Sequence, residues 1–444
     1  MSAAREHWGS RFGFIMAAAG SAVGIGNIWR FPYTTGNNGG GAFLLIYLAM
    51  VLGFGIALAT AEMLVGRSAQ RNPVGAFRIL GGKGWPLVGY AGALTGFVIL
   101  SFYIIVAGWT LAYIWLMASG QLHTTDPEQL NQVFGSFVAD PVRPIAYSAL
   151  FMGLTAWIVA GGIAHGIERW NKVLMPSLFI ILLVLVARSL TLPGGMAGVE
   201  FYLKPDFSKV TAHTFYDAIA QVFFSLSIGM GTLLTYGSYL SKNEHLPKAA
   251  LTVAMIDTGV AVLAGLMIMP AVFAFGFNPS AGPGLTFVTL PAVFASMPGG
   301  DLFGVLFFSL LAIAALTSAI SILEPMVSYF VDEHAASRHK TVIIASLVCF
   351  ALGIPASLSF GLTAGFTIAG KNWFDLMDFL ANNIMLPLGG LLTAIFVGWV
   401  WKDAVKELRN QGALSLRWAP LWLLVLRFLA PLGILWIMLS ALFG

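Results

Sequence analysis

The chain has 444 residues, of which 58% are hydrophobic and 9% are charged, and its formal net charge is +4. Soluble domains average about 45–50% apolar and about 25% charged residues, so this composition excludes an ordinary soluble enzyme or binding domain. We predict an all-α polytopic membrane protein with one transmembrane domain over residues 1–444.

A membrane crossing needs about 20 mostly apolar residues, and eleven segments of this chain meet that requirement. They cover residues 11–36, 41–66, 86–119, 143–161, 167–190, 215–240, 248–276, 301–331, 341–360, 373–401 and 418–442. The first segment contains Arg30 and runs directly into the second, unlike a cleavable signal peptide. We therefore expect it to remain in the mature protein.

The first apolar segment contains the run Ser21-Ala-Val-Gly-Ile-Gly-Asn-Ile-Trp-Arg-Phe31, in which Gly24 and Gly26 loosen a helix at membrane depth. Unwound backbone is tolerated there only where protein, water or a ligand satisfies its polar groups. The run therefore predicts a binding site. Alternatively, the glycines only allow neighbouring helices to approach closely.

The sixth apolar segment contains a second glycine-rich interruption, Ser225-Leu-Ser-Ile-Gly-Met-Gly231. Paired interruptions at corresponding positions indicate a transporter built from inverted repeats, with its site near the middle of the bilayer. We predict a first five-helix repeat at 11–190, a second at 215–401 and a peripheral eleventh helix at 418–442.

Few ionisable residues lie inside the predicted spans, namely Arg30, Glu62, Asp257, Glu324 and Asp378. Such charges are costly in a membrane and usually face a cavity or a partner. The alternative for each is a position near a helix end, where the side chain reaches water.

Lys and Arg are distributed unevenly between the two sides. Sixteen of the 23 fall on the side of the N-terminus: Arg5, Arg11, Arg67, Arg71, Arg78, Lys83, Arg169, Lys172, Lys242, Lys248, Arg338, Lys340, Lys402, Lys406, Arg409 and Arg417. The positive-inside rule predicts a cytoplasmic N-terminus and, after eleven spans, an external C-terminus in the cell's inner (plasma) membrane. This basic face explains the net charge, so we expect no nucleic-acid partner.

Several motifs occur together in a specific order. They are Trp8 with Arg11, Gly20–Asn27, Trp29–Pro32, Asn38–Phe43, Gln221–Ser227, Leu316–Ser318, Glu324–Pro325 and Asp375–Phe379. With them the sequence resembles the neurotransmitter:sodium symporter family, most closely its bacterial amino-acid transporters of the LeuT type. The resemblance implies a 5+5 inverted-repeat fold with broken helices 1 and 6 and eleven transmembrane helices.

The resemblance also implies two sodium sites. The first would use the Ala22 carbonyl, Asn27, Ser225, Asp257 and the substrate carboxylate, and the second would use the Gly20, Val23 and Ala314 carbonyls with the Thr317 and Ser318 hydroxyls. Hard cations such as sodium prefer oxygen ligands of these kinds. The alternative is that both hydroxyls only bond back to their own helix.

The implied substrate is an amino acid, because monoamine carriers of this family have an aspartate where this chain has Gly24. The implied substrate-binding residues are Ser21, Ala22, Gly24, Gly26, Ile99, Tyr103, Phe224, Ser225, Ser227, Gly229, Met230, Ala319 and Ile322. Their apolar, adaptable side chains predict hydrophobic L-amino acids, aromatic ones included. Alternatively, the apolar members only pack helices together.

The resemblance places gates on both sides of the substrate. The outer gate would consist of Arg30 and Asp378 with Gln221 nearby and Tyr103 and Phe224 as a lid, and the inner gate of Arg5 and Asp332 with Trp8 and Tyr239. Exposed ion pairs contribute roughly 0–1 kcal/mol, which suits contacts that open in every cycle. Gly166 and Pro176 resemble a family feature that lets the fifth helix unwind on the cytoplasmic side.

Asp257 stands where the leucine transporter of the LeuT type has an asparagine. The resemblance therefore implies that the charge of Asp257 replaces a bound chloride, and we predict transport without chloride.

The main alternative function is a proton-driven carrier, or a carrier for another small zwitterion. The sodium dependence of uptake separates these alternatives. An intramembrane enzyme is not expected, because the chain contains no His-Glu-x-x-His motif. A channel would show no counterflow of labelled substrate. We expect a monomer to suffice for transport and leave dimerisation open.

Overall fold

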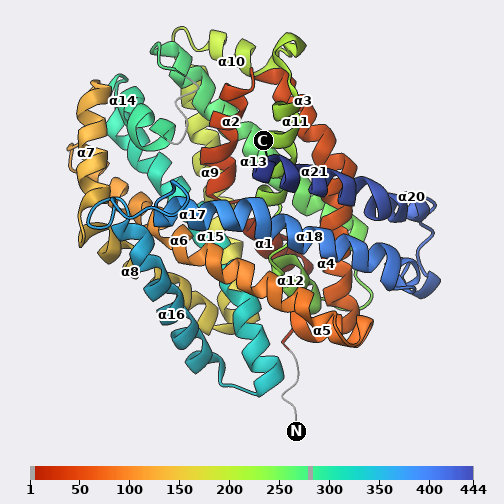
Figure 1. Ribbon diagram of the computed structural model, residues 1–444. Helices are drawn as coiled ribbons and strands as arrows, with labels where there is room; N and C mark the ends of the chain where they lie inside the picture. Colours follow the sequence, from red (N-terminus) through yellow and green to blue (C-terminus); the bar gives the residue numbers. More distant parts are fainter. Residues whose placement is uncertain (1–5, 279–283, 444) are drawn as a thin grey trace.

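The computed structural model describes residues 6–278 and 284–443 and is almost entirely helical over them (Figure 1). By length and hydropathy, nine helices of this part cross a membrane, and one bent pair makes a tenth. The nine are α3–α4 (Gly41–Ala69), α6 (Pro86–Ala118), α8 (Arg143–Ala160), η3–α9 (Ile163–Leu190), α13 (Leu246–Ala274), α15 (Gly300–His334), α16 (Arg338–Leu358), α17–η7 (Trp373–Val400) and α20–α21 (Ala419–Leu442).

The bent pair is the first predicted span. Helix α1 (Arg11–Ala22) ends at the predicted interruption, and η1 (Gly26–Arg30) and α2 (Phe31–Asn37) continue at an angle of 53°. The Ser10 hydroxyl caps α1 by accepting a hydrogen bond from the Gly13 amide at 3.0 Å. The predicted break in the first span is therefore confirmed.

The sixth predicted span is also broken. Helix α11 (Ala212–Ser225) and helix α12 (Thr232–Ser238) are separated by the irregular residues 226–231. Gly229 and Gly231 have φ values of +93° and +75°, which L side chains rarely adopt. The two glycines therefore allow the break, and the pair α11 and α12 occupies the position of the predicted sixth crossing.

Several segments predicted as loops form short helices. They are α5 (Pro73–Gly81), α7 (Pro127–Ala139), α10 (Met196–Leu203), η5 (Leu285–Thr289) with α14 (Leu290–Ala295), and α19 (Ala404–Leu408). Two begin with a proline after a capping side chain, Asn72 before α5 and Asp126 before α7. A search for 20 apolar residues does not detect such helices.

The two interrupted helices lie inside the bundle. Helix α1 contacts α9, α13 and α15, and all its residues from Gly13 to Ala22 are buried, while α12 packs against α4. Small residues permit the second contact, because a Cβ added at Gly237 would lie 2.5 Å from the Met63 carbonyl oxygen. The backbone breaks are thus shielded from lipid.

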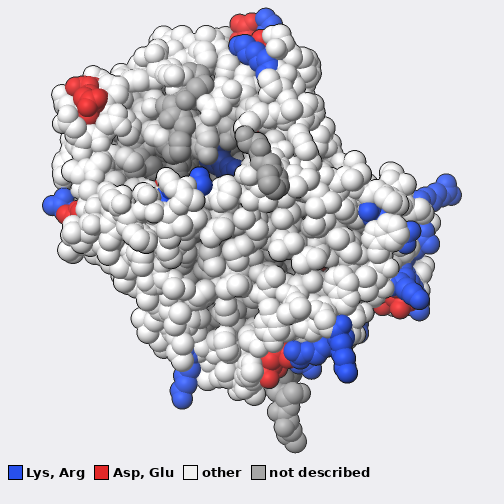
Figure 2. Space-filling model, viewed as in Figure 1, with Lys and Arg blue, Asp and Glu red and all other residues white. Residues whose placement is uncertain are grey.

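Charged residues avoid the middle of the surface. Figure 2 shows a broad band of uncharged side chains across one face, with Lys and Arg gathered along its lower and right edges. The termini of α1, α4 and α12 meet at this basic end, where Arg11 pairs with Glu244 at 3.0 Å and Arg67 donates to the Glu244 carbonyl at 2.7 Å. We call this the basic end of the bundle.

Candidate binding site between the interrupted helices

A small cavity of about 20 Å³ lies between the two helix breaks. Its lining consists of Ser21, Ala22, Gly24, Ile25, Gly26, Asn27, Ile99, Tyr103, Phe224, Ser225, Ser227, Met230, Ser318 and Ile322. The Ser227 hydroxyl donates to the Ser21 carbonyl at 2.9 Å and so joins one break to the other. The structure thus brings together most of the predicted substrate-binding residues.

Gly229 and Ala319 do not line this cavity. The Gly229 amide donates instead to the Glu62 carboxylate at 2.7 Å, and Ala319 is fully buried. Glu62 on α4 therefore satisfies a backbone donor that the break in the sixth span leaves free. The sequence identified Glu62 as a charge inside a span, but it did not reveal this partner.

One polar cluster joins both breaks to α13. The Asn27 amide group donates to the Asp257 carboxylate at 2.7 Å, and the Ser225 hydroxyl donates to its other oxygen at 2.7 Å. The Asn27 side-chain oxygen accepts from the Gly24 amide at 3.1 Å. Asn27 and Asp257 are completely buried. Three of the residues predicted for the first sodium site thus meet, next to the cavity-lining Ala22.

A second oxygen cluster joins α15 to the end of α1. The Ser318 hydroxyl lies 3.5, 3.4 and 3.2 Å from the carbonyl oxygens of Gly20, Ser21 and Val23. The Thr317 hydroxyl lies 3.0 Å from the Ala314 carbonyl oxygen and 3.5 Å from that of Val23.

The Ser318 distances are longer than those of strong hydrogen bonds, whereas Thr317 also bonds back to its own helix, 3.3 Å from the Ile313 carbonyl oxygen. Strong O–H···O bonds are about 2.7–2.8 Å long, and one hydroxyl proton cannot serve three carbonyl oxygens. The oxygens that Gly20, Val23, Ala314, Thr317 and Ser318 contribute are those predicted for the second sodium site. Their chemistry suits a hard cation.

A larger cavity of about 340 Å³ lies on the side of the central cavity away from the basic end. Ile25, Gly26, Ile99, Tyr103 and Phe224 line both cavities and therefore separate them. The Tyr103 hydroxyl lies 3.5 Å from the Ile25 amide. Tyr103 and Phe224 thus occupy the position predicted for a lid.

Arg30 and Asp378 both line this larger cavity, but no ion pair joins them among the described residues. The Arg30 guanidinium lies 5.1 Å from the centre of the Phe224 ring, and Asp378 accepts a hydrogen bond from Asn382 at 2.6 Å. Gln221 donates weakly to the Gly26 carbonyl at 3.4 Å. The predicted outer gate residues are therefore assembled without their ion pair.

Contacts at the basic end close the other side. The Trp8 indole donates to the Tyr236 carbonyl at 3.0 Å, and the Tyr239 hydroxyl donates to Glu324 at 2.7 Å. Asp332 accepts from the Asn72 amide at 2.9 Å. Arg5, the predicted partner of Asp332, lies outside the described residues.

Two acidic residues at this end have partners that the sequence did not predict. Glu324 forms a buried ion pair with Arg338 at 2.5 Å. Glu168 at the start of the fifth span accepts from the Gly9 amide at 2.6 Å and the Ser10 hydroxyl at 2.8 Å, and it pairs with Lys172. Glu168 therefore fastens the segment before α1 to the fifth span.

Comparisons with known proteins found relatives over nearly the whole chain. The model of the sodium:neurotransmitter symporter family matches residues 5–130 and 143–443. The uncharacterized sodium-dependent transporter YhdH of Bacillus subtilis is 40% identical over 98% of this chain and 97% of its own length, and a sodium-dependent transporter of Haemophilus influenzae is 41% identical over 99% and 98%. The crystal structure of MhsT in complex with L-phenylalanine has a TM-score of 0.90 and 49% identity, and the match covers 99% of this chain and 100% of that one.

Proposed function

Because the chain belongs to the sodium:neurotransmitter symporter family, whose members are sodium-coupled transporters and not enzymes, we propose that it imports hydrophobic L-amino acids together with sodium. The substrates include aliphatic and aromatic amino acids, and the cycle works by alternating access. The observation that carries this proposal is the meeting of two helix breaks at a cavity with oxygen clusters beside it.

The cavity has groups for both ends of an amino acid. Helix η1 begins at the break, and the partial positive charge at its N-terminal end suits a carboxylate. The buried hydroxyl of Ser21 has no hydrogen-bond partner among the described residues, so it is free to meet a polar substrate group. A Cβ at Gly24 would lie 2.7 Å from the Ser318 oxygen, so the site has no room for an acidic side chain there.

The side-chain pocket is apolar and deformable. Ile99, Met230 and Ile322 line it with Phe224, and methionine adapts its shape to different ligands. At about 20 Å³ the cavity is far below the roughly 300 Å³ of typical ligand sites, so binding requires these side chains to move. The phenylalanine bound to the related MhsT supports an aromatic substrate for this chain also.

Two sodium sites would couple the binding of sodium to the binding of substrate. An ion beside Asn27, Ser225 and Asp257 would connect both breaks to α13, and an ion beside Thr317 and Ser318 would connect α1 to α15. Each ion favours the conformation in which its ligands meet. Sodium therefore raises substrate affinity, because both stabilise the same state.

The charge of Asp257 supports chloride-independent transport. Its carboxylate lies within hydrogen-bond distance of Asn27 and Ser225 and supplies a fixed negative charge next to the first proposed cation. A bound anion is then unnecessary for charge balance.

We further propose that the basic end faces the cytoplasm in the plasma membrane. Residues 11–190 and 215–401 are the two proposed repeats, and a monomer suffices for transport.

The proposal is tested by uptake of labelled L-phenylalanine into proteoliposomes. An inward sodium gradient should drive accumulation, equimolar potassium should not, and gluconate in place of chloride should leave the rate unchanged. Asp257→Asn should lose most sodium-driven uptake, whereas Asp301→Asn, which changes a half-exposed carboxylate far from the site, should retain it.

Each alternative gives a different result in the same assay. Uptake driven by a proton gradient without sodium would contradict sodium coupling. Competition by betaine but not by leucine, phenylalanine or tryptophan would contradict the substrate class. A several-fold loss of uptake in gluconate would contradict chloride independence alone.

A further inference from the structure

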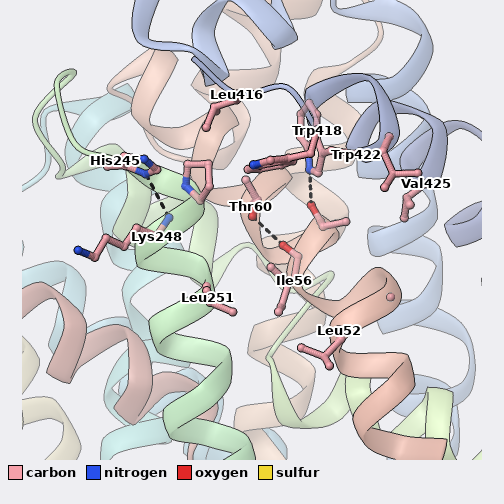
Figure 3. A pocket seen from close by; sticks show the side chains of 14 residues that line it. Leu52, Ile56, Thr60, His245, Lys248, Leu251, Leu416, Trp418, Trp422 and Val425 are labelled. Atoms are coloured by element: carbon pink, nitrogen blue, oxygen red, sulfur yellow. Dashed lines mark hydrogen bonds between the residues drawn. The ribbon is translucent and has the colours of Figure 1, made fainter. Parts of the chain in front are cut away.

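The largest cavity described lies away from the central site, on the flank of the bundle near the basic end. It has a volume of about 510 Å³ and is walled by η2 (Val51–Gly55) and α4, by the start of α13, and by α20 (Ala419–Leu424) with η9 (Val425–Leu429) (Figure 3). We call it the flank groove. None of its lining residues lines the central cavity.

The flank groove is hollow because one wall is recessed. Gly53 is exposed, and a Cβ added there would meet no atom within 4 Å. Figure 3 shows that the backbone carbonyls of this wall are already used: the Trp422 indole donates to the Ala57 carbonyl at 3.1 Å, and the Thr60 hydroxyl donates to the Ile56 carbonyl at 2.7 Å. These two carbonyl oxygens therefore have protein donors and do not depend on water.

The rim of the flank groove is apolar and exposed. Leu52, Leu251 and Leu421 come from three different spans and are 59%, 44% and 63% exposed. In a transmembrane bundle such a surface faces hydrocarbon. The part of an occupant that lies in the groove is therefore an apolar chain.

Exposed cations lie in the segments that form the end of the groove. Lys248, in the first turn of α13, lines the groove, and Arg417 lies between the lining residues Leu416 and Trp418. Lys242 lies in the loop that precedes α13. All three cations are exposed, and none has an ion-pair partner among the described residues. The one acid of this loop, Glu244, is paired with Arg11.

We propose that the flank groove binds an anionic phospholipid, with an acyl chain along Gly53 and the headgroup near Lys248 and Arg417. Basic residues next to a span attract anionic headgroups, and exposed tryptophans such as Trp418 occur at the same depth. The lipid joins the peripheral eleventh span to the second and seventh spans. This proposal depends only on the membrane position of the chain and not on its substrate.

The test compares phosphatidylglycerol with phosphatidylcholine of identical acyl chains, added to delipidated full-length protein while thermal unfolding is followed. Phosphatidylglycerol should stabilise the protein at lower concentration than phosphatidylcholine. Lys248→Ala should raise its half-saturating concentration about fivefold and leave that of phosphatidylcholine unchanged. Gly53→Trp fills the groove and should abolish the effect of both lipids.

Two matched variants serve as controls. Lys340→Ala removes an exposed cation at the basic end outside the groove. Gly153→Trp adds the same large side chain at another exposed glycine, where an added Cβ would also meet no atom within 4 Å. Both should respond to lipid like the wild type. Equal effects of the two lipids on the wild type, or an unchanged phosphatidylglycerol response in Lys248→Ala, would overturn the proposal even if Gly53→Trp failed to fold.

Discussion

The two ends of the central cavity are closed by different kinds of contact. Toward the larger cavity of about 340 Å³, a thin layer that includes the side chains of Tyr103, Phe224 and Ile99 covers the site, and no ion pair joins Arg30 to Asp378 among the described residues. Toward the basic end, a buried ion pair and several hydrogen bonds join α12, α15 and α16. The structure is therefore closed toward the basic end and more accessible from the opposite end.

In the proposed transport cycle, this difference places the larger energetic cost at the basic end. A side-chain lid should open with little cost, because it moves an aromatic ring and the partly buried Arg30 without breaking an ion pair. The basic end opens only if buried charges separate, which is strongly unfavourable unless another event compensates. Binding of ligand and sodium at the central site is the event that the proposed mechanism supplies.

The largest expected effect comes from breaking the buried ion pair. In Glu324→Gln the Arg338 guanidinium keeps its charge but loses its carboxylate partner, so the free energy of unfolding should fall by about 3–5 kcal/mol. Thermal unfolding of the purified protein measures this loss. Glu333→Gln is the matched control, because its partner Arg78 is 50% exposed and the expected loss is about 1 kcal/mol or less. Equal losses in the two variants would refute the distinction.

A smaller effect should follow from Glu168→Gln. The Glu168 carboxylate accepts bonds from Gly9 and Ser10 on its two oxygens; glutamine keeps one acceptor oxygen and so loses one such bond, about 1.5–3 kcal/mol. The segment before α1 should therefore exchange its amide hydrogens faster, as mass spectrometry would detect. Exposed Glu200→Gln should leave this exchange unchanged. Unaltered protection of residues 9–13 in Glu168→Gln would show that Glu168 does not fasten the segment.

Pro176→Ala tests how the basic end opens. The π-helical turn η3 (Ile163–Glu168) contains Gly166, and Pro176 lies inside α9 (Arg169–Leu190). Alanine restores the missing backbone hydrogen bond and should make unwinding harder, so turnover should fall about tenfold, or about 1.4 kcal/mol, with substrate affinity retained. Initial uptake rates and equilibrium binding separate these quantities. Unchanged turnover and unchanged hydrogen exchange near Gly166 would exclude this role.

The smallest expected effect on stability is at the outer end. Arg30→Ala removes a cation–π contact with Phe224 that contributes about 0.5–1 kcal/mol, so the unfolding temperature should hardly change. Substrate should dissociate several-fold faster, because the lid loses its cation. A loss of stability as large as that of Glu324→Gln would contradict the proposed asymmetry between the two ends.

The sequence predicted the parts of the fold that depend on local backbone chemistry. Gly229 and Gly231 mark one break because glycine tolerates positive φ values. Gly24 and Gly26 mark the other because Ser318 and Phe224 leave no room for a Cβ there. The residues proposed to bind sodium through oxygen atoms were predicted from the family resemblance. The structure brings Asn27, Ser225 and Asp257 together in one cluster, and Thr317 and Ser318 lie next to the end of α1.

Partners distant in the chain were not predictable. Glu324 pairs with Arg338 and Glu168 with the Gly9 amide only because α15, α16 and the fifth span pack as they do. No local pattern assigns a backbone donor to a carboxylate 159 positions away. The missing Arg30 to Asp378 pair is likewise a property of one conformation, which a sequence does not specify.

The most direct test of the central claim is equilibrium binding of labelled L-phenylalanine to the purified protein in sodium and in potassium. The account predicts saturable binding in sodium and an affinity at least about tenfold weaker in potassium, a coupling free energy of about 1.4 kcal/mol or more. By reciprocity, phenylalanine should lower the sodium concentration needed for half-maximal binding. Equal affinity in the two salts would contradict the claim that one site between the helix breaks binds substrate and sodium together.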